Sequence, residues 1–154
     1  MTKPRSLSRS AARLAAVQAL YQHDMEATPV AQLLHEFHLH RLGATIDEES
    51  FDDASYAEAE VEFFDDIVRG CITRLDEVDQ TITDKLATGW NLARLERAMK
   101  AVLRCGAYEL MARQDIPAAS TISEYVDVAK AFHDPREAGF VNGLLDGVAK
   151  GLHR

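Results

Sequence analysis

Hydrophobic positions recur at three- and four-residue steps along most of the chain, which is the spacing of helices that bury one face. The strongest example runs from Leu92 to Met111, where leucine, methionine, valine and alanine side chains leave little of the helix circumference polar. A helix that is apolar nearly all round packs against neighbours on several sides. We therefore predict a long central helix over 92–111, with the other helices packed around it.

The amino-terminal sequence predicts a flexible arm followed by a helix. Residues 1–7 contain Pro4 and serines, which favour a flexible basic arm. Ser6 or Ser8 can cap a first helix that runs to about residue 25. The spacing of apolar residues predicts that the core face of this helix carries Leu14, Val17, Leu20, Tyr21 and Met25.

The middle of the chain predicts three further helices and an acidic link. Thr28 is a candidate cap and Pro29 suits a first turn, so a second helix is expected to about residue 42. Residues 44–55 are acidic and poor in apolar side chains, which predicts a link without secondary structure. Ser55 and Glu58 have capping-box spacing and predict the start of a third helix, and a fourth is expected to end near residue 88.

The carboxyl-terminal part predicts two helices after the central one. Thr121 and Glu124 have capping-box spacing, and Asp134 followed by Pro135 is typical of a last helix start. Glycine costs nearly 1 kcal/mol inside a helix, so a row of four glycines in the last helix predicts the close approach of another helix backbone. These glycines are Gly139, Gly143, Gly147 and Gly151. With no strand pattern, the sequence predicts an all-α protein of about seven helices in one domain, 1–154.

Charge is distributed unevenly along this chain of net charge −8. Four cations precede the first acidic residue, whereas residues 47–66 hold ten acids and no base. Arg5, Arg9 and Arg13 are four residues apart and form one basic stripe on a helix. Such a stripe is either an ordinary solvated face or a binding site for an anion, and the spacing alone leaves both readings open.

Other residue types argue against catalysis and metal binding. Cys71 and Cys105 fall on apolar helix faces, which indicates small buried side chains in a reducing compartment. Three histidines, His35, His38 and His40, do not share one helix face, so we interpret them as polar surface. No catalytic motif or cofactor loop is present, and we predict a protein without enzyme activity or cofactor. The chain has no secretory signal or run of eighteen apolar residues, which predicts a cytoplasmic protein outside the membrane.

Three blocks of sequence, taken together, resemble the NusB family of bacterial transcription antitermination factors. They are Arg9-x-x-x-Arg13 followed by Ala16-Val17-Gln18-Ala19-Leu20-Tyr21; Lys100-Ala101-Val102-Leu103-Arg104 with Tyr108-Glu109-Leu110; and Ile122-x-Glu124 leading through Ala129-Lys130-x-Phe132 to Phe140-Val141-Asn142-Gly143-x-Leu145-Asp146. The resemblance covers nearly the whole chain and implies two packed helical subdomains. It also implies binding of the boxA element of ribosomal RNA leader transcripts together with NusE, a small-subunit ribosomal protein, and recruitment to elongating RNA polymerase.

The resemblance also implies which residues contact RNA. The arginine-rich amino-terminal segment of the family contributes to RNA binding, and the tyrosine of the first helix and the aromatic residue opening the last helix match it as well. The RNA-binding residues implied in this way are Lys3, Arg5, Arg9, Arg13, Tyr21 and Phe140. About four phosphates would be neutralised, so log affinity is expected to fall with log salt at a slope near −3.

Several alternatives stay open at this point. Met99 stands where many family members carry an acidic residue, which leaves that part of the partner contact undefined. A purely protein-binding helical adaptor would use the acidic stretch and leave the arginines as solvated surface. A helper of a ribosomal RNA methyltransferase, acting in trans, is another alternative. Self-association into a homodimer that hides the arginine face would create an inactive state.

Overall fold

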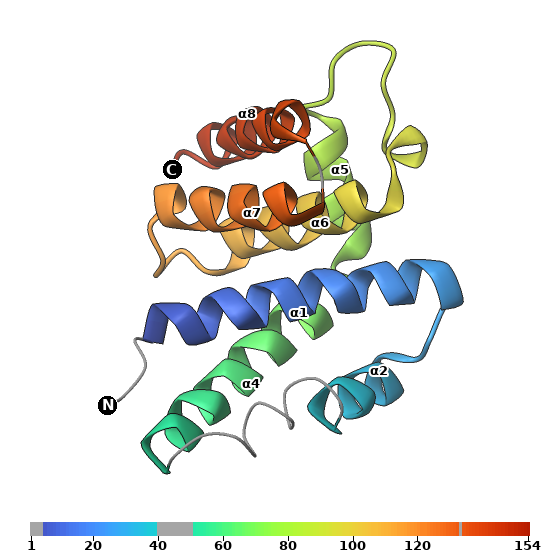
Figure 1. Ribbon diagram of the computed structural model, residues 1–154. Helices are drawn as coiled ribbons and strands as arrows, with labels where there is room; N and C mark the ends of the chain where they lie inside the picture. Colours follow the sequence, from blue (N-terminus) through green and yellow to red (C-terminus); the bar gives the residue numbers. More distant parts are fainter. Residues whose placement is uncertain (1–4, 40–50, 133) are drawn as a thin grey trace. The chain divides into compact units, whose positions relative to one another are not determined.

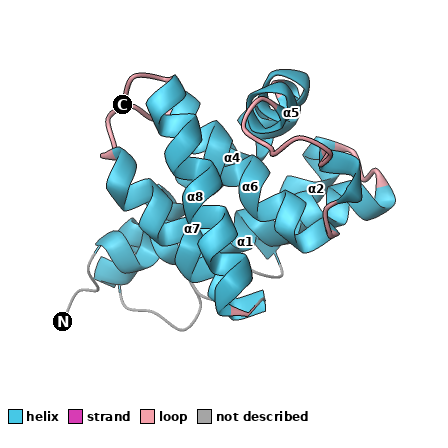
Figure 2. Ribbon diagram, turned by 90° about the horizontal axis from the view of Figure 1, so that it is seen from above, coloured by secondary structure: helices cyan, strands magenta, loops and turns pink. Residues whose placement is uncertain are grey.

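The computed structural model describes the backbone at residues 5–39, 51–132 and 134–154, and the side chains of these ranges except those of 5–8 and 51–60. In those ranges the secondary structure is helical, without a strand (Figures 1 and 2). The elements are α1 (Arg5–Glu26), α2 (Val30–Phe37), α4 (Phe51–Thr73), α5 (Leu75–Thr83), the short 3-10 helix η2 (Leu92–Arg94), α6 (Arg97–Ala112), α7 (Ala118–Phe132) and α8 (Pro135–Gly151). The prediction of an all-α fold with about seven helices is confirmed.

The chain divides into two compact units, residues 1–72 and residues 73–154. Unit 1 contains α1, α2 and most of α4, and unit 2 contains α5, η2, α6, α7 and α8. Two helical units agree with the two subdomains that the family resemblance implies. None of the described helices is both long and apolar enough to cross a membrane.

The core face of α1 is built from alanines rather than from its largest side chains. Val17 and Leu20 are buried as predicted, but Leu14, Tyr21 and Met25 are 36%, 38% and 50% exposed, so the prediction was wrong for these three. The buried positions are completed by Ala12, Ala15, Ala16 and Ala19. Because alanine side chains are short, neighbouring groups can approach the α1 backbone closely, and the larger apolar residues are left on the outer face.

Helices α2 and α4 share an aromatic contact in unit 1. The ring centroids of Phe37 and Phe64 are 5.6 Å apart with 24° between the planes, a stacked arrangement.

Three predicted helix starts in unit 1 were wrong. Pro29 precedes α2 without a side-chain cap, so Thr28 is not the cap residue that was predicted. Helix α4 begins at Phe51, so the predicted link is wrong for 51–55 and the capping box at Ser55 does not start the helix; residues 44–50 lie outside the described part. Likewise α1 begins at Arg5, inside the predicted arm.

Helix α6 forms the core of unit 2, packing against α5, α7 and α8. It begins at Arg97, where the Glu96 carboxylate accepts the backbone N–H groups of Ala98 and Met99, each at 3.1 Å. The predicted start at residue 92 was wrong, because Asn91 instead caps η2 by accepting the Arg94 N–H. Most of α6 is buried, which confirms the prediction that it packs on several sides.

A buried carboxylate ties α6 to α7. Glu109 is fully buried, and its side chain accepts hydrogen bonds from Tyr125 Oη at 2.9 Å and Thr121 Oγ1 at 3.1 Å. A buried carboxylate is costly unless it is hydrogen-bonded, so these hydroxyls stabilise it. Because α7 begins at Ala118, Thr121 lies inside the helix, and its predicted role as a cap residue was wrong.

Two ion pairs involve α5: one connects it to α6, and the other lies at its amino terminus. Arg104 of α6 donates from Nε and Nη2 to the Asp79 carboxylate at 2.8 and 2.9 Å. At the start of α5, Arg74 donates to both carboxylate oxygens of Glu77 at 2.9 Å. This hydrogen bonding lowers the pKa of Glu77 from its ordinary value.

The glycines of α8 differ from expectation, whereas its start agrees. Asp134 caps α8 by accepting the N–H groups of Arg136 and Glu137, as predicted. A Cβ at Gly139 or Gly143 would meet nothing within 4 Å. Near Gly147 and Gly151 the neighbouring atoms belong to the Lys85 side chain, so no helix backbone covers the row and that prediction was wrong.

The glycine with a close neighbour lies in α6 instead. A Cβ at Gly106 would be 2.8 Å from the Leu145 side chain, which comes from α8. A side chain at position 106 would therefore displace the Leu145 side chain that packs between α6 and α8.

Candidate nucleic-acid interface

Two of the predicted RNA-binding arginines lie together on one aromatic ring in unit 1. The guanidinium carbons of Arg9 and Arg13 are 4.8 and 5.0 Å from the ring centroid of Phe63, which belongs to α4. We call Arg9, Arg13 and Phe63 the arginine stack. An aromatic face attracts a cation at these distances, and the Phe63 ring therefore stabilises both guanidinium charges.

The two arginines differ in access to solvent. Arg13 is only 4% exposed, whereas Arg9 is partly exposed. Phe63 itself is 3% exposed, so the ring that holds both guanidiniums is part of the core of unit 1. Arg13 therefore braces the arginine stack from inside, and Arg9 is its member at the surface.

The other two cations of the segment are described less completely. Arg5 is the first residue of α1, four residues before Arg9, and its side chain lies outside the described part. Lys3 lies wholly outside the described residues. The helical backbone at Arg5 continues the four-residue spacing that the sequence predicted for the basic stripe.

Tyr21 lies on the same helix as the stack but further along it. Its position is eight residues after Arg13, about 12 Å along the helix axis. The side chain is 38% exposed, so Tyr21 is a surface aromatic residue and not the buried one that its apolar spacing suggested. The aromatic ring is accessible to a ligand.

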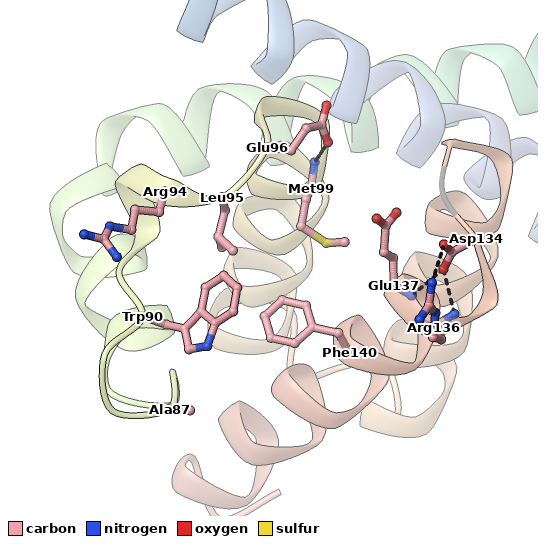
Figure 3. A pocket seen from close by; sticks show the side chains of 10 residues that line it. All are labelled: Ala87, Trp90, Arg94, Leu95, Glu96, Met99, Asp134, Arg136, Glu137 and Phe140. Atoms are coloured by element: carbon pink, nitrogen blue, oxygen red, sulfur yellow. Dashed lines mark hydrogen bonds and ion pairs between the residues drawn. The ribbon is translucent and has the colours of Figure 1, made fainter.

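Phe140 belongs to a cavity in unit 2 of about 750 Å³, which we call the Trp90 cavity. Its apolar lining comes from Ala87, Trp90, Leu95, Met99 and Phe140 (Figure 3). Trp90 is 59% and Phe140 is 39% exposed, and Figure 3 shows the two rings projecting toward one another from different segments. Cavities of this size hold small ligands or parts of larger ones.

Charged residues form the rest of the lining of the Trp90 cavity. They are Arg94, Glu96, Asp134, Arg136 and Glu137. Two of the carboxylates also cap helices, since Glu96 caps α6 and Asp134 caps α8. Helices α6 and α8 therefore both begin at the cavity. The partial positive charge of each amino terminus offsets part of the negative charge of the lining carboxylates.

Trp90 is a candidate residue that sequence reasoning missed. It stands between Gly89, which has a positive φ of 91°, and the cap residue Asn91, in a segment without a helical pattern. The sequence does offer one indication of Trp90: it is the single tryptophan of the chain, and it falls outside the predicted amphipathic helices. Only the fold reveals that Phe140, fifty positions later, faces the same cavity.

The described residues offer no alternative metal centre. No group of three or more His, Cys, Asp or Glu side chains in the described ranges is placed to hold a metal ion. His38 Nε2 lies 2.7 Å from Asp65 Oδ1, a local pair between the end of α2 and α4. Cys71 and Cys105 are both fully buried, which confirms the prediction that they are small core residues.

Comparison with known proteins identifies relatives over nearly the full length of the chain. The NusB family profile matches residues 10–150. The transcription antitermination protein NusB of Sphingopyxis alaskensis is 64% identical over 150 residues, which are 97% of each chain. The solved structure of T. maritima NusB has 32% identity and a TM-score of 0.77, covering 97% of this chain and 93% of that one.

A further solved structure has a similar fold at lower identity. It contains the antitermination factors NusB and NusE in complex with double-stranded RNA, and the similar chain has 23% identity and a TM-score of 0.72, with 94% of this chain and 98% of that one covered. At this identity the likeness supports the fold alone. The family match and the identity to curated relatives lead to one conclusion: this chain belongs to the NusB family.

Proposed function

We propose that this protein is a transcription antitermination factor that binds the boxA element of ribosomal RNA leader transcripts together with NusE. The observation that carries the proposal is the 64% identity, over 97% of both chains, to a transcription antitermination protein. The relatives are named for a role in transcription and not for an enzyme activity. In this role the protein acts in the cytoplasm on elongating RNA polymerase.

The surface chemistry of the chain supports an RNA ligand. Single-stranded RNA is bound by cations on its phosphates and by aromatic rings that stack on its bases. Arg9 is partly exposed and is held on Phe63, while Tyr21 and Phe140 expose aromatic rings. Both kinds of contact are therefore available, and we assign Lys3, Arg5 and Arg9 to phosphates.

The burial of Arg13 changes the expected salt dependence. Because Arg13 is 4% exposed, we assign it to holding the arginine stack rather than to a phosphate. Three phosphate contacts, from Lys3, Arg5 and Arg9, predict that log affinity falls with log salt at a slope near −2. This is shallower than the slope near −3 that four contacts would produce.

Charge reversal at Arg9 distinguishes this function from that of a protein-binding adaptor. We expect Arg9→Glu to weaken boxA RNA binding by at least tenfold and to leave NusE binding unchanged, because a phosphate contact becomes a repulsion. Arg69→Glu is the matched control, since Arg69 is an exposed arginine of unit 1 on α4 outside the arginine stack. Binding is measured by fluorescence anisotropy of labelled RNA and by calorimetry for NusE. An Arg9→Glu variant that keeps full RNA affinity would contradict the proposed site.

A further inference from the structure

We propose that the Trp90 cavity takes up one unpaired base of the bound RNA, stacked between the rings of Trp90 and Phe140. This inference rests on the proposed function and adds to it a site in unit 2, with Trp90 as a recognition residue. The cavity combines an apolar lining with two exposed aromatic rings, Trp90 and Phe140.

The geometry of the two rings favours a flat ligand. Trp90 comes from the segment before η2 and Phe140 from the first half of α8, and both project into the cavity (Figure 3). Met99 and Leu95 line the same cavity and add apolar surface beside the two rings. Unpaired bases stack on aromatic side chains in this way, and such stacking tolerates any base because every base has a π face.

The charges around the cavity suit a base with its neighbouring phosphate. Arg94 and Arg136 line the cavity, and Arg97 and Lys100 follow in the first turns of α6. The lining itself carries the two arginines Arg94 and Arg136 and three carboxylates, Glu96, Asp134 and Glu137, a net charge of −1 in a chain of net charge −8. This region is therefore less repulsive to a nucleic acid than the chain as a whole.

The carboxylates also have a use in base recognition. Glu137 lines the cavity, and so does Glu96, whose two oxygens each accept one backbone N–H of α6 and have a second lone pair. Carboxylates accept hydrogen bonds from the amino groups of bases, as in contacts to cytosine N4. A base with an amino group on its edge therefore fits the cavity better than one that carries only acceptors there.

The single tryptophan makes the proposal directly measurable. Stacking of a base on an indole quenches its fluorescence, and Trp90 is the only tryptophan of the chain. We expect boxA RNA to quench the emission of the full-length protein in the presence of NusE that lacks tryptophan. Replacing one base at a time by an abasic site should abolish the quenching at one position and leave it intact at the others.

Substitutions provide a second readout. Trp90→Leu and Phe140→Leu keep an apolar side chain but remove the ring, and each should weaken RNA binding by about tenfold. Phe132→Leu is the matched control, because Phe132 is an exposed phenylalanine of the same unit outside the cavity lining, and its RNA affinity should not change. Far-UV circular dichroism verifies that each variant is folded.

The possible outcomes separate this inference from the proposed function. RNA that binds with normal affinity to Trp90→Leu and leaves Trp90 emission unchanged would overturn the base site while leaving the antitermination role intact. Emission that changes with NusE alone, with Trp90→Leu weakening NusE but not RNA, would reassign the cavity to a protein partner and overturn the inference. Wild-type protein that binds no RNA, even with NusE, would overturn both.

Discussion

Two aromatic residues, one in each unit, have opposite surroundings. Phe63 in unit 1 is 3% exposed and carries the guanidinium groups of Arg9 and Arg13 over its ring. Trp90 in unit 2 is 59% exposed and faces a cavity. The first ring stabilises the fold and fixes charges in place, whereas the second contributes little burial and is accessible to a ligand. Aromatic content alone therefore says little about function until burial is known.

The largest effect predicted from this comparison is on stability. Phe63→Ala should lower the free energy of unfolding by about 3–5 kcal/mol, because it leaves a cavity in the core of unit 1 and removes the support of both arginines. Urea unfolding followed by circular dichroism measures this value. A loss below about 1 kcal/mol would contradict the closed surroundings of Phe63.

The buried arginine should depend on the same ring. Arg13→Gln should lower the free energy of unfolding by about 2 kcal/mol, because a desolvated cation loses its contact with the aromatic face. In a Phe63→Leu background the same substitution should cost clearly less, since the ring is already absent. Equal costs in the two backgrounds would show that Phe63 does not stabilise Arg13.

Two helical glycines test the same contrast between closed and open surroundings. Gly106→Ala should destabilise by about 1–3 kcal/mol, because its Cβ would collide with Leu145. Gly143→Ala should stabilise by up to about 1 kcal/mol, since nothing lies within 4 Å and alanine is the better helix former. Thermal unfolding of the two variants checks the opposite signs. A lower stability of Gly143→Ala would contradict the open surroundings of α8 at this position.

The smallest effect on stability is expected at the open rings. Trp90→Leu and Phe140→Leu should each change the free energy of unfolding by no more than about 0.5 kcal/mol, because both side chains are exposed. Urea unfolding by circular dichroism, which does not need the tryptophan signal, is the appropriate measurement. A loss above about 2 kcal/mol would indicate that these rings support the fold.

The sequence predicted correctly those features of the helices that depend only on neighbouring residues. The cap at Asp134 and the buried stripe of α6 follow from neighbouring residues alone, and both were predicted correctly. The start of α6 was missed because Leu92 and Leu95 continue the apolar spacing of the helix, although Leu92 belongs to η2 and Leu95 is an extended residue. The spacing of apolar residues cannot distinguish a helix from a non-helical apolar segment that precedes it.

The remaining errors arise from tertiary contacts. Thr121 has the spacing of a cap residue, but its hydroxyl donates to the buried Glu109 twelve positions earlier. Arg13 looks like a surface cation until Phe63 of α4 is placed beneath it. The Trp90 cavity requires two segments that are fifty positions apart in the chain. Each of these depends on which helices pack together, which a single sequence does not encode in its local pattern.

The most direct test of the proposed function compares boxA RNA with a scrambled RNA of the same length, with and without purified NusE, at two salt concentrations. We predict tighter binding to boxA, a further gain with NusE, and a log–log salt slope near −2 for the isolated protein. Equal, weak binding to both RNAs that NusE leaves unchanged would contradict the account and favour a protein-binding adaptor.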